Sequence, residues 1–172
     1  KGTMIDATEL LSSTSMISST NLSDHSLYAL LSGKNVIFYS LNNAFKNNAF
    51  FSNSSNLVDV SIWDVSNVKD FSSVFEGCTN MTGIDLSRWD TAKAKYLDTM
   101  FFCCEKLLNL NVTNWNTSNV RQMYSMFFGC KKLKTININN WDVSKVTDMW
   151  SLFVGCAELE SIDLSKWNTA SV

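Results

Sequence analysis

The sequence repeats with a period of 26 residues over most of its length, and no other feature constrains the fold as strongly (89 − 63 = 26 for the first two tryptophans). Three columns of identical residues keep this interval. They are Trp63, Trp89, Trp115, Trp141 and Trp167; Phe75, Phe101, Phe127 and Phe153; and Cys78, Cys104, Cys130 and Cys156. A fixed period in this range indicates supersecondary units that stack on their neighbours. The sequence therefore predicts an elongated array of coils.

The clearest copy of the unit is Leu133–Cys156. Its first segment alternates apolar and polar residues around Ile136 and Ile138, a pattern typical of a short strand with one buried face. Asn137, between them, should then point outward. Asp142–Val146 follows and is rich in turn-forming residues. Stacking such units predicts a ladder of short parallel strands.

The second half of the unit predicts short helical turns. Val146, Met149, Leu152 and Phe153 recur at helix-like spacing, and Gly155 is suited to end a helical turn. A second short strand followed by a single turn is the alternative, and the pattern leaves both open. The expected fold class is an α/β repeat solenoid with short parallel strands and short helical turns.

The first part of the chain does not share the period. A helix over Asp24–Ser32, capped by Ser23 and ended by Gly33, and a strand over Asn35–Leu41 are predicted there. We interpret residues 1–55 as an N-terminal cap with a degenerate first repeat, and residues 56–172 as the repeats. Because the sequence stops in mid-unit, we expect the array to continue beyond residue 172 in the native protein.

The unit resembles a known family. The pattern L-x-x-I-x-I-x-x-W, followed by WDVSKVTDMWSLFVGC at 141–156, is similar to the BspA-like leucine-rich repeats of surface proteins, over about residues 57–172. One copy departs from it, with Ala92, Ala94 and Cys103 in place of Ser, Val and Gly. The resemblance implies that the solenoid is a right-handed coil of the leucine-rich-repeat type. It also implies a place at the cell surface or outside the cell, and a role in attachment or protein binding. It names no ligand.

Composition argues against several functions. A net charge of −2 disfavours nucleic-acid binding, and no run of about 18 apolar residues predicts a transmembrane segment. The only histidine, His25, lies outside the repeats and belongs to no nucleophile motif. Without a phosphate-binding glycine loop or a motif-placed carboxylate pair, we expect no enzyme activity and no cofactor.

Two repeated columns could hold metals, but each has a simpler interpretation. The cysteines lack the paired spacing of zinc sites, and a ladder of small buried side chains explains them. We expect Cys103, which stands outside that column, to be the first thiol to react. The acidic or amide residue after each tryptophan, such as Asp142, suits turn capping better than calcium binding. No metal site is predicted.

The candidate ligand-binding residues are the outward positions of the strands. They are Asp85, Asn109, Asn111, Thr135, Asn137 and Asp163. Repeat arrays bind partners through extended faces of this kind. A merely solvated sheet face would show the same pattern, and the sequence does not separate the two.

The candidate protein-contact residues are large aromatic side chains in the variable columns of the second half of the unit. They are Phe102, Tyr124, Phe128 and Trp150. Exposed aromatic patches mark protein contacts. Packing of these rings against flanking coils is the alternative.

The leading hypothesis is a non-enzymatic surface repeat protein, in which the strand face binds a protein or a glycan. The alternative is a structural or assembly element, a rigid spacer or filament subunit whose partners are neighbouring copies of itself. Polymers that form with rising concentration would favour assembly, and a monomer would favour binding.

Overall fold

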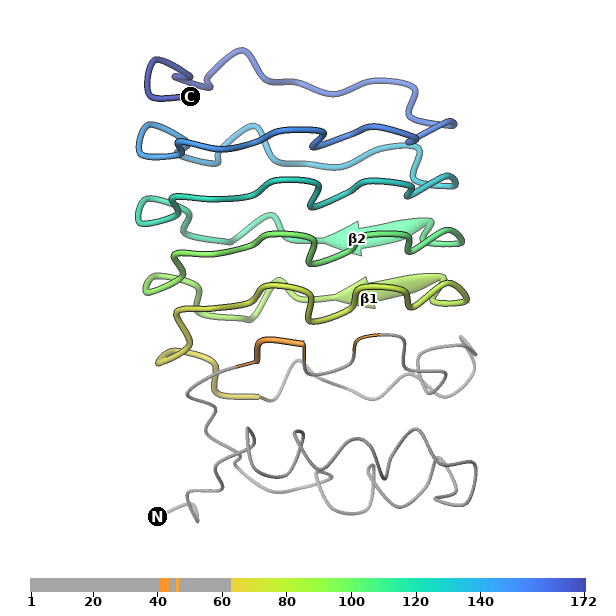
Figure 1. Ribbon diagram of the computed structural model, residues 1–172, viewed down its shortest axis with the longest axis horizontal. Coiled ribbons are helices and arrows are strands. Elements are labelled where there is room, and N and C mark those ends of the chain that lie inside the picture. The colour runs from red at the N-terminus through yellow and green to blue at the C-terminus, as the bar shows by residue number, and fades with distance from the viewer. Residues whose placement is uncertain (1–40, 44–45, 47–62) are drawn as a thin grey trace.

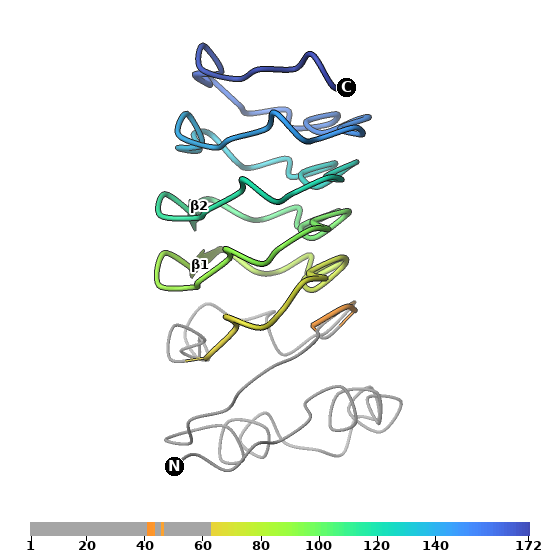
Figure 2. The same cartoon turned by 90° about the vertical axis from the view of Figure 1, so that its left-hand side faces the viewer.

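The computed structural model describes residues 41–43, 46 and 63–172. From residue 63 onward the chain winds into coils that stack one upon another from the N-terminal to the C-terminal side (Figure 1). Figure 2 shows the same stack from the side. The predicted helix over Asp24–Ser32, and nearly all of the N-terminal cap, lie outside the described residues. In the described part, no helix is long and apolar enough to span a membrane.

One side of the stack carries the predicted parallel strands. Strand β1 (Gly83–Asp85) pairs with β2 (Asn109–Asn111) in parallel, with Ile84 opposite Leu110. The offset equals the sequence period, so each coil is one repeat. In the later coils the pairing is reduced to a single parallel bridge, Thr135 with Ser161. Ile84 is buried and Asp85 exposed, which confirms the predicted alternation in β1.

The opposite side carries a second parallel ladder. Isolated bridges join Asp70 to Tyr96, Tyr96 to Gln122, and Gln122 to Asp148. Every second amide of this stretch donates to a carbonyl of the next coil. For the first coil these bonds are Phe71 N to Tyr96 O, Ser73 N to Asp98 O, Phe75 N to Met100 O and Gly77 N to Phe102 O, at 2.8–2.9 Å. The next two coils repeat the pattern.

This ladder replaces the short helical turns expected from the spacing. The described coils contain no helix. Ser73 and Gly77 adopt left-handed conformations, with φ of 58° and 73°, and their equivalents in later coils do the same. Because the left-handed residues reorient the chain, alternate amides point to the next coil, whereas the others bond three residues back, as in Glu76 N to Ser73 O (3.2 Å). A helix would keep every amide within its own coil.

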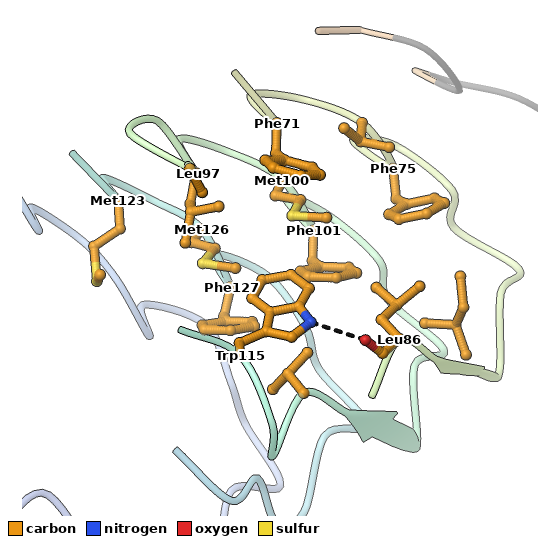
Figure 3. Close-up of a cluster of buried hydrophobic side chains, with 14 of the residues drawn as sticks. Phe71, Phe75, Leu86, Leu97, Met100, Phe101, Trp115, Met123, Met126 and Phe127 are labelled. Carbon is orange, nitrogen blue, oxygen red and sulfur yellow. Dashed lines mark hydrogen bonds between the residues drawn. The ribbon is translucent and has the colours of Figure 1, made fainter. Parts of the chain in front are cut away.

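Between the two ladders lies a continuous core of stacked rings. The centroids of Trp89 and Trp115 are 6.5 Å apart and their planes differ by 1°; those of Trp115 and Trp141 are 5.9 Å apart. The indole N–H of Trp115 donates to the carbonyl of Leu86 at 2.9 Å (Figure 3). The indole N–H groups of Trp141 and Trp167 donate in the same way to the carbonyls of Val112 and Ile138, so from Trp115 onward the tryptophan column joins coils both by stacking and by hydrogen bonds.

The cysteine column is part of the same core, as predicted. The Sγ–H of Cys104 donates to the carbonyl of Phe75, and that of Cys130 to the carbonyl of Phe101, each at 3.2 Å. Burial raises the pKa of both thiols. Cys78 is buried like these two. The thiols act as small core side chains with a weak donor.

Candidate functional site

The structure brings the six predicted ligand-binding residues together in one hollow. The hollow has a volume of about 960 Å³, lies open on the strand face and extends over four successive coils. Its lining includes Asp85, Asn109, Asn111, Thr135, Asn137 and Asp163. All six side chains are exposed. Their placement on one face is confirmed, whereas their role in binding stays a prediction.

Gly83 deepens the hollow at its N-terminal end. A Cβ at this position would lie 3.3 Å from the carbonyl oxygen of Asn109 and 3.5 Å from its Cβ. Leu108, which is 44% exposed, adds an apolar wall nearby. The sequence interpretation missed Leu108 as part of the site. An apolar residue in a column that otherwise holds Thr82, Lys134 and Glu160 was the available signal.

Three of the six residues also stabilise the turn that follows their strand. Oδ1 of Asp85 accepts the N–H of Ser87 at 2.9 Å, and Oδ1 of Asp163 accepts that of Ser165 at 2.9 Å. Asn111 accepts the hydroxyl of Thr113 at 3.1 Å. These bonds from the serines lower the pKa of Asp85 and of Asp163, so both carboxylates are ionised at neutral pH.

The other three residues do not stabilise a turn in this way. The side chains of Asn109, Thr135 and Asn137 are exposed and have no hydrogen-bond partner among the described residues. They occupy the middle of the hollow, between the two carboxylates. The face thus offers neutral amide and hydroxyl groups at its centre and negative charge at both ends.

The predicted aromatic contact residues do not form one site. Phe102 and Phe128 are half-buried and stack on each other, with ring centroids 4.8 Å apart and an interplanar angle of 11°. Tyr124 is 38% exposed and Trp150 is 73% exposed. The two phenylalanines therefore contribute to coil stacking, and only the tyrosine and the tryptophan present their rings to solvent.

The residue after each tryptophan caps a turn, as expected. Oδ1 of Asp142 accepts the N–H of Ser144 at 2.9 Å, and Oδ1 of Asn116 accepts that of Ser118 at 3.1 Å. Hydrogen bonds from Ser144 lower the pKa of Asp142. Asp and Asn serve equally here because the turn needs only one acceptor oxygen.

Cys103 differs from the other cysteines in both conformation and exposure. It occupies the left-handed position that glycine fills in the other coils, with φ of 56°, and it is half-buried. Burial, followed by the charge of Glu105, raises the pKa of its thiol. It remains more accessible than Cys104 or Cys130, so the prediction that it reacts first keeps its physical basis.

Comparison with protein families gives one match. The family described as "Mycoplasma protein of unknown function, DUF285" matches residues 39–135 and 102–172. The chain belongs to this family. The two matched segments overlap and together include the whole strand face and both ladders. No curated protein and no solved structure matches.

Proposed function

We propose that this chain is a right-handed solenoid of the BspA-like leucine-rich-repeat type and that it acts as a non-enzymatic surface protein. On this proposal its strand face binds a protein or a glycan outside the cell. The 26-residue register of the parallel strands and the stacked tryptophan column support the repeat type. The surface location rests on the resemblance of the repeat.

One observation carries the binding proposal. The hollow on the strand face is lined at its centre by Asn109, Thr135 and Asn137, whose polar groups have no partner among the described residues. Such groups can form hydrogen bonds with a ligand without first breaking bonds within the protein. Their position on two successive coils at the centre of the hollow suits an extended ligand that lies along the stack.

The test is a triple alanine substitution at Asn109, Thr135 and Asn137. The purified chain is applied to a printed panel of glycans and to immobilised collagen and laminin, and the bound fraction is measured. We expect the wild-type chain to bind at least one panel member and the triple variant to lose that binding. Because the three side chains are exposed and unpaired, the unfolding midpoint should change little.

A matched control removes exposed polar groups elsewhere. Thr79→Ala combined with Asn114→Ala alters two exposed side chains that lie outside the hollow. This control should bind as the wild type does. If the triple variant binds equally well, the strand face is not the binding surface. Polymers that grow with protein concentration, without binding to the panel, would favour the assembly function instead.

A further inference from the structure

Most basic side chains of the described coils are paired with the neighbouring coil. Lys93 donates to Asn67 and Lys106 to Asn80, each at 2.7 Å. Lys145 donates to Asn119 at 3.3 Å. The remaining pairs are Lys46 with Glu76, Lys131 with Glu105, Lys132 with Glu158, Lys134 with Glu160, and Lys166 with Asn140. The repeat therefore usually places an acceptor one period away from each lysine.

Among the described basic residues, Arg88 and one row of three cations break this rule. Lys69, Lys95 and Arg121 are one period apart, and no side-chain hydrogen bond or ion pair joins them to any described residue. The backbone places them directly in line, because Lys95 N donates to Lys69 O at 2.8 Å and Arg121 N to Lys95 O at 2.9 Å. Lys69 and Arg121 are exposed and Lys95 is half-buried.

Stacking like charges in this way has a cost for the folded chain. Neighbouring parallel strands lie roughly 4.8 Å apart, so the cations start from backbone positions at about this spacing. Like charges directly opposite one another on paired strands are destabilising. The free chain leaves that repulsion uncompensated by any ion pair among the described residues, and a ligand with several negative charges would relieve it.

The same stretch of the coils carries exposed aromatic rings. Tyr96 follows Lys95 directly and is 37% exposed, and Tyr124 lies three residues after Arg121 and is 38% exposed. Neither ring stacks on another ring of the described chain. A tyrosine offers an apolar face and a hydroxyl that forms hydrogen bonds, which suits the apolar and polar faces of a sugar ring.

The stretch also carries acceptors for hydroxyl donors. Oδ1 of Asp70 accepts the N–H of Ser72 at 2.9 Å, and Oδ1 of Asp148 accepts that of Trp150 at 3.0 Å. Asp98, which is buried, accepts the N–H of Tyr124 at 3.0 Å. The second oxygen of Asp148 has no partner among the described residues. These acids would repel a nucleic-acid strand, which carries a charge on every phosphate. A sugar polymer carries hydroxyl donors beside its charged groups, so it can pair with the cations and also donate to these oxygens.

We infer that this row, together with Tyr96 and Tyr124, is a second binding surface and that its ligand is an acidic polysaccharide. The cations pair with sulfate or carboxylate groups, the tyrosine rings contact sugar faces, and the aspartates accept hydroxyl hydrogens. The surface is separate from the hollow on the strand face. A negative result for one proposal therefore leaves the other unaffected. It is a local feature, since the net charge of the whole chain is −2.

The experiment measures binding of the full 172-residue chain to immobilised heparin, used as a sulfated polysaccharide probe, over a range of salt concentrations. Neutral dextran and single-stranded oligo-dT are the comparison ligands. The test variant is K69Q/K95Q/R121Q. We expect it to lose affinity by about tenfold or more and to lower the salt slope by about three, one for each cation removed.

The control variant is K93Q/K106Q/K145Q. It removes the same charge from three exposed lysines elsewhere on the stack, each of which is already bonded to an asparagine. It should keep its affinity for heparin within about twofold and keep most of the salt slope. Equal losses in the two variants would mean that only the overall charge matters, which would overturn the proposal.

The other outcomes are equally decisive. Tyr124→Ala should weaken heparin binding while leaving the salt slope unchanged, because it removes a ring and no charge. Tighter binding of oligo-dT than of heparin would assign the row to nucleic acid and overturn the inference. Failure of the wild-type chain to bind heparin at physiological salt, or equal binding of neutral dextran, would also overturn it. Unfolding midpoints of all variants exclude misfolding as the cause.

Discussion

Asp98 is an ionisable group whose charge the folded chain does not favour. Burial raises its pKa from 3.8 to about 6, against the hydrogen bond from the N–H of Tyr124, and the charges of Asp148 and Asp70 act in the same direction as burial. The residue is 6% exposed. Asp98→Asn keeps an oxygen that can accept from Tyr124 and removes the charge.

The sign and size of the effect follow from the two pKa values. Below the unfolded value of 3.8 the carboxyl is protonated in both states. As pH rises from there to about 6, the unfolded chain releases its proton first, so the wild type loses stability over this window and stays at the lower level above it. A shift of about two units corresponds to roughly 3 kcal/mol. Because solvent screens part of the charge, we expect a gain of about 1–2 kcal/mol for Asp98→Asn at pH ~8.

The assay is urea unfolding followed by tryptophan fluorescence, at pH ~4 and pH ~8. The variant should be more stable than the wild type at the higher pH and nearly equal at the lower. Asp142→Asn is the control of opposite sign, because hydrogen bonds from Ser144 lower the pKa of Asp142; it should gain nothing at the higher pH. A difference between Asp98→Asn and wild type that does not change with pH would refute the reasoning.

Two substitutions test the contacts between coils, and a labelling experiment tests the burial of the cysteines. Trp115→Ala removes a buried ring that stacks on both neighbours and should cost about 3–5 kcal/mol in urea unfolding; an unchanged midpoint would exclude the tryptophan column from the core. Gly129→Ala should lower thermal stability by about 1–2 kcal/mol, since φ is +71° and the new Cβ would lie 3.3 Å from Sγ of Cys103, and a neutral result would contradict this. Native maleimide labelling, read by mass spectrometry, should modify Cys103 before Cys104 and Cys130; the reverse order would disprove the burial argument.

The repeat register and the strand face could be predicted from the sequence because each follows from one periodic pattern. A period of 26 places Ile84 beside Leu110, and alternation puts Asp85 outward. The second ladder was predicted only as the alternative of a second short strand, which the parallel bridge from Gln122 to Asp148 bears out. Val146, Met149 and Phe153 have the spacing of a helix. The backbone N–H groups point to the next coil because Ser151 adopts a left-handed conformation, and a serine side chain gives no sign of that conformation in the sequence.

The hollow and the cation row were also beyond the periodic pattern. Alternation places the six polar residues on one face, but it does not show how closely the coils approach at Gly83, where a Cβ would lie 3.3 Å from the carbonyl oxygen of Asn109. The cation row is recognised because Lys69, Lys95 and Arg121 have no acceptor one period away among the described residues. A sequence shows which residues share a column, but whether a lysine has a partner depends on the distances between side chains in neighbouring columns.

A residue change in one coil can be compensated by a residue of the neighbouring coil. A position where this happens is explained by the architecture and needs no functional reason. Where Gln122 replaces the aspartate that would bond the N–H two residues on, Asp98 of the preceding coil supplies the oxygen to Tyr124. Asp70 and Asp148 do the same within their own coils. This exchange keeps the N–H of Tyr124 bonded and needs no ligand to explain it. Lys69, Lys95 and Arg121 show no exchange of this kind, so the most direct reason for keeping three cations in line is a partner from outside the chain.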